Sequence, residues 1–550
     1  MDVFKNSSLI MNNTGFSTLD YAVFIAYGLI IVFIGLWVSR KKKGKEKTAQ
    51  DYFLASKALP WWAIGASLIA ANISAEQMIG MSGSGFAIGL GIASYEWMAA
   101  ITLILVGKFF LPIFLKKKIY TMPQFLELRY DGRVRTVMAT FWLIVYVFVN
   151  LTSVLYLGAL ALKTIMGIPL MYGIVGLALF AAIYSIYGGL TAVVWTDVVQ
   201  VIFLIGGGLL TTYLALDAVS DGQGAIAGFE HLLKYAPEKF DMILEEGALL
   251  IPDGNGGLKD AYMDLPGIGV LVGGMWIANI SYWGFNQYII QRGLAAKSIK
   301  EAQRGMIFAG FLKILIPLVV VIPGIAAFVL TKESSIVLEP SDKAYPWLLH
   351  EFIPIGLKGL AFAALAAAIV SSLASMLNST ATIFTMDIFK RFINKNVSET
   401  KMVTVGRATS FIALTIAVLT AKPLLGNLDQ AFQYIQEFTG FVTPGVCIIF
   451  CFGFFWKRAT ANAALWIAIL TIPLSAVFFF FAPEVPFIDR MGYVALILAC
   501  IGILISVIES KTDSPKGIDL YKGIFHTGTP FNVGAIILCA IVAVLYIIYW

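Results

Sequence analysis

Two apolar stretches of the sequence are interrupted by polar residues, and both interruptions begin with the same four letters. The first reads ANISAEQMIG (71–80) and the second ANISYWGFNQ (278–287). Asparagine and glutamine side chains both donate and accept hydrogen bonds. A helix unwound at such a place also offers carbonyl oxygens to a cation and amide groups to a solute. The chemistry indicated is reversible binding. The residues concerned are Asn72, Ser74, Glu76 and Gln77 in the first stretch and Asn279 in the second.

Charged residues also occur in the middle of apolar segments, notably Glu96 in ASYEWMAAI and Lys313 in FAGFLKILI. An ionised side chain inside such a segment is expensive unless it faces a partner or water. Neither residue is close enough to a segment end to reach the interface, so both indicate a functional cavity. Asp197 and Gln436 lie mid-segment in the same way. A single polar residue of this kind can instead serve helix packing.

A third feature is an alanine-rich stretch, LAFAALAAAIVSSLASMLNSTAT (360–382). Its polar residues recur at helical spacing and therefore form one stripe. Small residues allow close helix packing, which is one interpretation of the stripe. The other is an all-oxygen site, in which hydroxyls and nearby carbonyls bind a hard monovalent cation. The stripe consists of Ser371, Ser372, Ser375, Asn378 and Ser379.

These residues must be positioned by membrane-spanning helices. Of the 550 residues, 59% are hydrophobic and only 13% are charged, and the mean hydropathy is +0.84. Apolar runs recur throughout the chain, each long enough to cross a hydrocarbon layer ~30 Å thick. The sequence predicts an all-α integral membrane protein of about fourteen spans, with no competing soluble domain. The predicted spans are 20–38, 60–84, 87–113, 137–162, 168–188, 193–218, 265–289, 305–331, 356–386, 403–424, 429–456, 461–482, 491–509 and 531–550.

The distribution of basic residues predicts the orientation of these spans. If the RKKKGKEK run (40–47) is cytoplasmic, most of the 39 Lys and Arg residues fall in cytoplasmic loops, including Arg292. The positive-inside rule then places both termini outside. The basic residues serve topology, so the net charge of +6 does not indicate nucleic-acid binding. The large outer segment, 219–264, is expected to carry short surface helices.

The two polar interruptions occupy corresponding places in two groups of spans. With 20–38 set aside, each interruption lies in the opening helix of a five-span group, 60–218 and then 265–456. An odd number of spans reverses the orientation of the second group, so the two groups are predicted to be inverted repeats. Broken helices at matching positions of such repeats indicate a transporter's midplane binding site. The residues 461–550 then form extra C-terminal helices of a single transmembrane domain.

Other functional classes fit the sequence less well. An enzyme would need a nucleophile–base pair or a metal cluster, whereas the three His lie singly in loops and the four Cys in spans. A channel would usually need a symmetric oligomer with a filter ring. The sequence leaves the oligomeric state open.

Several motifs resemble the sodium/solute symporter family, most closely its bacterial members that carry galactose or glucose. The resemblance covers nearly the whole chain and is densest in LPWWAIGASLIAANISAEQMIGMSGSG, SIYGGLTAVVWTDVVQ, YWGFNQYIIQR, AALAAAIVSSLASMLNSTATIFTMDI and AFQYIQEFTGFVTPG. It implies a leucine-transporter-like core of two five-helix inverted repeats and alternating access. It also implies residence in a bacterial inner membrane, sodium-coupled sugar uptake, sodium as co-substrate and no cofactor.

The resemblance also implies roles for individual residues. The monosaccharide would be bound by Gln77, Glu96, Asn279, Lys313 and Gln436, with Tyr282 stacking on its ring as an inner gate. Met81, Tyr95 and Phe432 would close the site from outside. Sodium would be held by the carbonyls of Ala70, Ile73 and Ala368 and the hydroxyls of Ser371 and Ser372. Asp197 and Ser375 are candidates for a second ion or for coupling.

The identity of the solute has alternatives. The same transport machinery could carry an inositol, an amino acid or an organic acid. An anionic solute would call for excess positive charge in the pocket, whereas Glu96 and Lys313 balance each other. A sugar is therefore the preferred prediction.

Overall fold

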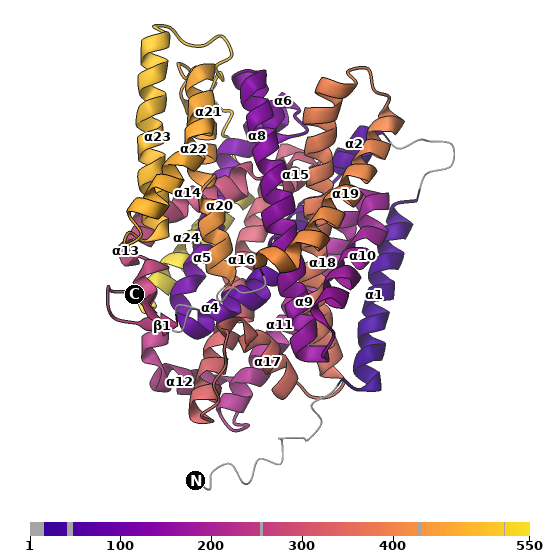
Figure 1. The fold of residues 1–550 in the computed structure, drawn as a ribbon, viewed down its shortest axis with the longest axis vertical. Helices are drawn as coiled ribbons and strands as arrows, with labels where there is room; N and C mark the ends of the chain where they lie inside the picture. Colours follow the sequence, from indigo (N-terminus) through magenta and orange to yellow (C-terminus); the bar gives the residue numbers. More distant parts are fainter. Residues whose placement is uncertain (1–15, 41–47, 253–256, 426–430, 522) are drawn as a thin grey trace.

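A computed structural model describes residues 16–40, 48–252, 257–425, 431–521 and 523–550 of the chain. Within these residues the protein is a helical bundle (Figure 1). The basic run on which the predicted orientation depends, 40–47, lies almost wholly outside the described residues. The predicted fold class, an all-α membrane protein, is confirmed.

Among the described residues, eleven helical segments are long and apolar enough to cross a membrane. A twelfth is obtained if 261–272 and 274–285, which are bent by 79° at their junction, count as one span. Two further predicted spans, 60–84 and 429–456, consist of shorter helices, so the count of fourteen stays a prediction. The eleven are α1 Thr18–Val38, Leu90–Lys117 (η4 to α6), Gly132–Met166 (α8 to α9), α10 Leu170–Gly188, α11 Leu190–Val219, α16 Ile299–Glu333, Leu357–Ile393 (α18 and η11), α19 Glu399–Leu425, α22 Ala461–Phe481, α23 Phe487–Glu509 and α24 Thr529–Ile548.

The first predicted interruption is a true break. Helix α3 (Trp61–Asn72) ends before Ile73, whose φ of −76° and ψ of 105° are extended. The chain resumes as a π-helical turn, η3 (Glu76–Met81), and then α4 (Ser82–Ala87). Local side chains satisfy the freed amides: Ser74 N–H donates to Gln77 Oε1 at 3.0 Å, and Glu76 N–H donates to Ser74 Oγ at 3.0 Å. The polar residues of this stretch therefore stabilise the break itself.

The second interruption lies at the C-terminal end of the predicted stretch, 278–287. Residues 278–281 remain helical, within α14 (Gly274–Ile280) and the π-helical turn η9 (Ser281–Phe285). The extended residue is Asn286, with ψ of 125°, directly before α15 (Gln287–Leu294). There the N–H of Gln287 donates to Tyr146 Oη at 3.0 Å, and the same hydroxyl contacts Asn286 Oδ1. A tyrosine from a distant helix satisfies the freed backbone, a contact that the repeated tetrapeptide does not encode.

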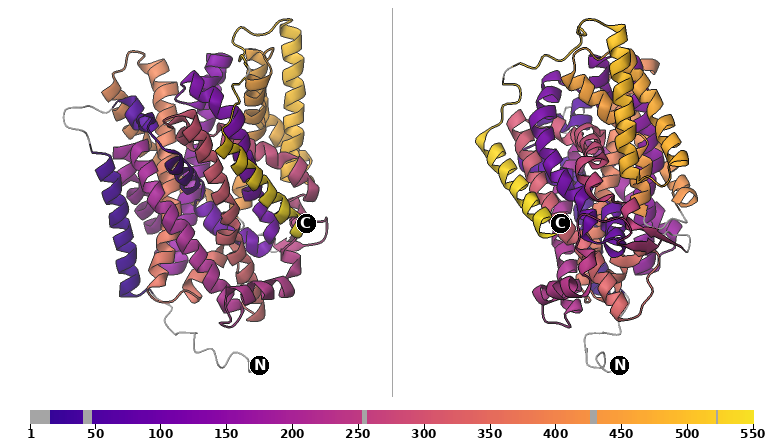
Figure 2. Two further views of the ribbon diagram at one scale, coloured as in Figure 1. Left: turned by 180° about the vertical axis from the view of Figure 1, so that it is seen from behind. Right: turned by 90° about the vertical axis from the view of Figure 1, so that its left-hand side faces the viewer.

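Close helix packing surrounds these breaks. Helix α11 packs along α18 (Leu357–Ile383), and α16 lies against α3, α4 and α5 (Ser94–Leu105). A Cβ atom added to Gly207 would lie 2.6 Å from the Cβ of Ala364, so small residues bring α11 and α18 together. Helix α1 lies at one edge of the bundle and α23 at the opposite edge (Figure 1). Helix α24 runs along the back (Figure 2).

The segment 219–264, which is predicted to lie on the outer side, carries short helices and an antiparallel pair of short strands within its described residues. Strands β1 (Leu250–Pro252) and β2 (Leu258–Asp260) pair antiparallel, with Ile251 opposite Lys259. The C-terminal region docks here, because Met242 N–H donates to the carbonyl of Tyr549 at 2.7 Å. The remaining elements are α2 Ala49–Leu54, η2 Ala55–Lys57, α7 Met122–Arg129, α12 Ala225–Tyr235, η7 Pro237–Lys239, η8 Ala261–Met263, α13 Gly267–Val272, η10 Ser341–Lys343, α17 Ala344–Glu351, α20 Ala431–Gly440 and α21 Thr443–Phe455.

Candidate functional site

A cavity lies between the first broken helix and helices of the second half of the chain. Its wall contains every residue predicted to bind the solute, and they come from both predicted repeats. It also contains the predicted outer gates Tyr95 and Phe432. The third gate residue, Met81, is fully buried and is not among the described residues of the wall. The six predicted solute-binding residues in the wall are Gln77, Glu96, Asn279, Tyr282, Lys313 and Gln436.

Glu96 and Lys313 form an ion pair in the cavity wall, which we call the cavity pair. Glu96 is on α5 and Lys313 on α16, and their exposed fractions are 3% and 1%. The Lys313 Nζ atom also lies 4.9 Å from the ring centroid of Trp283. A buried charge without a partner would be strongly destabilising, so each residue explains the presence of the other. The predicted mutual balance of these two charges is confirmed.

Two of the three amides predicted to bind the solute, Gln77 and Asn279, are held by their own helices. Gln77 Oε1 accepts hydrogen bonds from the backbone N–H and the hydroxyl of Ser74, the latter at 2.9 Å. Its amide N–H groups remain as donors. Asn279 Nδ2 donates to the carbonyl of Met275 at 3.2 Å, which fixes the plane of its amide. Both side chains are therefore preorganised for hydroxyl groups on a solute.

Aromatic residues close the cavity on two sides. The Tyr282 hydroxyl accepts a hydrogen bond from Asn72 Nδ2 at 2.9 Å and another from the Tyr288 hydroxyl at 2.5 Å. Tyr282 thus connects the first break to the second. On another side, the rings of Tyr95 and Phe432 meet edge to face, with centroids 5.2 Å apart. A gate built in this way opens when one ring moves.

The predicted cation site lies where α3 ends against α18. Ser372 Oγ donates to the carbonyls of Ala71 at 3.0 Å and Ile73 at 3.4 Å. In an unbroken helix the N–H of Ser74 would bond to the carbonyl of Ala70, but it donates to Gln77 instead. The break therefore frees carbonyl oxygens for a cation beside Ser372. Ala71 joins the predicted residues here, and the predicted Ala368 is fully buried on α18.

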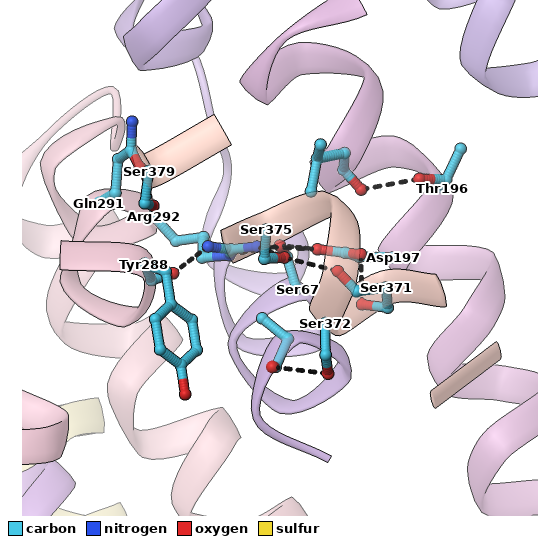
Figure 3. A network of polar contacts seen from close by, with 12 residues as sticks. Ser67, Thr196, Asp197, Tyr288, Gln291, Arg292, Ser371, Ser372, Ser375 and Ser379 are labelled. Atoms are coloured by element: carbon cyan, nitrogen blue, oxygen red, sulfur yellow. Dashed lines mark hydrogen bonds and ion pairs between the residues drawn. The ribbon is translucent and has the colours of Figure 1, made fainter. Parts of the chain in front are cut away.

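Ser371, the other predicted hydroxyl, faces a second buried cluster. Its Oγ donates to Asp197 Oδ1 at 2.6 Å. Asp197 Oδ2 accepts a hydrogen bond from Ser67 Oγ at 2.5 Å and lies 3.3 Å from Arg292 Nη2 (Figure 3). Arg292 Nε donates to Ser67 Oγ at 2.9 Å, and its guanidinium also contacts Ser375 Oγ. We call Ser67, Asp197, Arg292, Ser371 and Ser375 the buried network.

The prediction for Arg292 was wrong. We expected it in a cytoplasmic loop, because the predicted span ends at 289. It is fully buried on α15, four residues after Tyr288, whose carbonyl accepts a hydrogen bond from it. The motif YIIQR carried a usable signal, since an arginine two residues after an apolar run can face the bundle interior. Its partner Asp197 lies on α11 and could not be assigned from spacing alone.

The wall also contains polar residues to which the sequence analysis assigned no role. Glu76, in the first break, receives a hydrogen bond from the hydroxyl of Ser153 on α9 (Thr152–Met166). Asn150 lines the same cavity, and its Oδ1 has no hydrogen-bond partner. Within the described parts of the chain, no group of three or more His, Cys, Asp or Glu residues could hold a metal ion.

Comparison with known proteins identifies the family. The model of the family described as "Sodium:solute symporter family" matches residues 52–471. The chain belongs to this family. It is therefore a multi-pass membrane transporter and not an enzyme, as predicted. The symporter is 54% identical over 550 residues to a sodium/glucose cotransporter of Vibrio parahaemolyticus, with 98% of this chain and 99% of the relative covered.

More distant relatives and solved structures support the same fold. A sodium/myo-inositol cotransporter 2 of Oryctolagus cuniculus is 33% identical over 483 residues, covering 83% of this chain and 69% of the relative. The solved structure of a Na+-coupled sialic acid symporter in an outward-open, substrate-bound state superposes with a TM-score of 0.77. It is 26% identical and covers 90% of this chain and 99% of that chain. The nucleobase-cation-symport transporter Mhp1, at 13% identity and a TM-score of 0.51, shares the fold alone; 86% of this chain and 98% of that chain are covered.

Proposed function

We propose that this symporter couples inward sodium movement to uptake of a hexose by alternating access. The observation that carries the proposal is the cavity itself. It combines fixed amides, a charge pair and an aromatic ring around one space, and its wall comes from both halves of the chain. A sugar presents hydroxyls that donate and accept, together with a flat apolar face. The 54% identical relative named for sodium and glucose supports the same assignment.

In this proposal each predicted residue keeps its role. The amides of Gln77, Asn279 and Gln436 and the cavity pair bind sugar hydroxyls, while Tyr282 stacks on the ring. Tyr95 and Phe432, backed by Met81, close the outer side. Sodium binds to carbonyls of the first break, to the carbonyl of Ala368 and to the hydroxyls of Ser371 and Ser372. Asp197 and Ser375 serve coupling or a second ion.

The break in α3 gives sodium a means to drive the cycle. A gradient drives uptake only if sodium binds one conformation better than the other. The carbonyls of the first break, on Ala70 and Ile73, belong to the first predicted repeat, 60–218. The hydroxyls of Ser371 and Ser372 belong to the second, 265–456. We infer that relative motion of the two repeats assembles and loosens the site. We place both termini on the outer side of a bacterial inner membrane, from the distribution of basic residues.

A second candidate solute is myo-inositol, because relatives at 33% identity are named for it and it too is a ring of hydroxyls. An anionic solute, such as the sialic acid of the structural neighbour, fits less well. Lys313 is the only cationic side chain among the described residues of the wall, and it is paired with Glu96.

The test is uptake of labelled glucose, galactose, myo-inositol and sialic acid into proteoliposomes with an inward sodium gradient. Matched vesicles with an equal potassium gradient are the control. We expect accumulation of a hexose above the external concentration with sodium alone. Accumulation of inositol without hexose would favour the second candidate. Uptake that ignores sodium would contradict the proposal.

A further inference from the structure

The charges of the cavity do not balance when every lining residue is counted. Among the described residues of the wall, the ionisable acids are Glu76 and Glu96 and the only base is Lys313. Lys313 is engaged by Glu96. Glu76 therefore has no countercharge in the wall when it is ionised, although only 8% of its surface is exposed. A buried charge of this kind favours a cation from outside the protein.

The hydrogen bonds around Glu76 show the same imbalance. Its Oε1 accepts a hydrogen bond from Ser153, while its Oε2 has no protein donor among the described residues. Two amides of the same cavity wall, Asn72 and Asn150, are 4% and 7% exposed, and the buried Oδ1 atom of each has no hydrogen-bond partner within the described part of the chain. This part of the wall presents acceptor oxygens that need donors. Unsatisfied buried acceptors point to a ligand that supplies N–H or O–H groups.

The positions of these residues make one patch of the wall. Asn72 and Glu76 flank the extended residues of the first break, and η3 packs against α9, which carries Ser153. Asn150 precedes Ser153 by three residues, and its carbonyl oxygen lies 3.0 Å from the same Ser153 hydroxyl, whose single hydrogen it shares with Glu76. The cavity pair lies on other helices, α5 and α16. We call Asn72, Glu76 and Asn150 the acceptor patch.

The geometry points to a second substrate class for this cavity: a sugar that carries a protonated amino group, bound with its ammonium on the acceptor patch. A hydroxyl has one hydrogen to donate, whereas an ammonium has three and carries the charge that Glu76 lacks opposite it. Charge-assisted hydrogen bonds of this kind are also stronger than neutral ones. A sodium ion fits the patch less well, because a hard cation needs six or so oxygens around it and the patch lies on one open wall. The inference rests on the proposed function, since the rest of the sugar would use the hexose contacts.

The experiment is competition in proteoliposomes. Sodium-driven uptake of labelled glucose is measured against unlabelled glucose, glucosamine and N-acetylglucosamine, and uptake of labelled glucosamine is measured directly. We expect the wild-type protein to take up glucosamine, with an affinity within about tenfold of its affinity for glucose. Glu76→Gln should lower the affinity for glucosamine by a factor at least about tenfold larger than for glucose, because it removes the charge and keeps the shape of the side chain. N-acetylglucosamine, which is uncharged, should show no such selective loss.

Ser153→Ala is the matched control. It removes the hydrogen bond to Glu76 and leaves the carboxylate in place, so the ratio of glucosamine to glucose affinity should stay within about threefold of wild type. If Glu76→Gln transports neither sugar, binding is followed by the fluorescence of Trp142 and Trp283, which line the cavity. The same selective loss of glucosamine is expected there.

Three results would overturn the inference. The first is wild-type glucose uptake that is not inhibited by an excess of glucosamine of about a hundredfold. Another is a Glu76→Gln variant that weakens both sugars by the same factor. The third is a Glu76→Gln variant that needs more sodium for uptake of glucose and of glucosamine alike. That result would assign the acceptor patch to sodium. Absence of any sodium-driven hexose uptake by the wild type would instead contradict the proposed function.

Discussion

The cavity pair and the buried network are built from the same parts and differ in what surrounds them. Each joins an acid from the first predicted repeat to a base from the second. Asp197 and Arg292 are enclosed by three serine hydroxyls and a carbonyl. Glu96 and Lys313 instead border an open cavity and an indole ring. The buried network is saturated with protein hydrogen bonds, so we expect it to hold the helices together. The cavity pair lacks such saturation and is therefore available to a solute.

The largest effect should come from breaking the buried network. Arg292→Met leaves Asp197 buried without a countercharge, which costs about 3–5 kcal/mol. We expect a large loss of folded protein and a lower thermal midpoint in detergent. The double variant Asp197→Asn with Arg292→Gln should be more stable than the sum of the single changes, because neutral amides remain compatible with the serines. If Arg292→Met were as stable as the wild type, the buried network would not stabilise the fold.

Changes around the cavity pair should strongly impair or abolish transport and spare the fold. Gln77→Ala, Asn279→Ala and Glu96→Ala each remove a hydrogen-bonding group from the sugar, at about 1–3 kcal/mol, or roughly 5- to 150-fold in uptake. Water in the cavity can solvate the lysine that Glu96→Ala leaves behind, so membrane insertion should continue. The measurements are sodium-driven uptake and surface expression. Wild-type uptake by all three variants would remove the basis of the proposed site.

Ser372 tests the predicted cation site, where α3 ends against α18. Ser372→Ala removes one cation ligand from a helix already rich in alanine, so packing should change little. We expect normal expression, a raised sodium requirement or lost sodium-driven uptake, and retained sodium-independent sugar exchange. Counterflow and gradient-driven uptake in the same proteoliposomes measure this. An unchanged sodium dependence would move the ion toward Asp197 in the buried network.

Tyr282 offers a smaller and more graded test. Tyr282→Phe keeps the ring and loses hydrogen bonds to Asn72 and Tyr288, a change of about 1 kcal/mol. We expect much of the transport to remain, whereas Tyr282→Ala should lose it because no flat surface faces the sugar. Uptake rates of the two variants provide the comparison. If phenylalanine were as inactive as alanine, the hydroxyl would be the essential group.

The smallest effect concerns a buried cation outside the spans. Lys239 in the outer segment contacts the carbonyl of Ala87 and lies 4.4 Å from the ring centroid of Phe328. Burial lowers the pKa of Lys239 to about 8. The undocked segment therefore binds the proton more readily than the docked one, and docking should strengthen as pH rises from about 7.5 to 9, by about 1 kcal/mol.

Hydrogen exchange of the Ala87 region, corrected for the intrinsic pH dependence, would measure this docking. Lys239→Met is the control, because it keeps the length of the side chain and removes the titrating group. Protection should then be independent of pH. A pH dependence that survives in Lys239→Met would assign the effect to another group.

Much of the site followed from the sequence. The hydropathy pattern predicted an all-α membrane protein, and the polar residues within apolar segments predicted a cavity wall that includes Glu96 and Lys313. Such predictions succeed because a charge in an apolar segment is expensive and must face something polar. The first break also followed, since its capping groups, Ser74 and Gln77, lie within the same few residues.

Only the tertiary structure showed which groups meet across helices. It located the second break at Asn286, within the predicted stretch, where Tyr146 from another helix satisfies the backbone. It also showed that Arg292, predicted in a loop, is buried beside Asp197. In the cavity wall it showed that Glu76 has no countercharge among the described residues. The physical reason is that hydropathy and helical spacing describe one segment at a time. The partner of a buried polar group is decided by which distant helix packs against it.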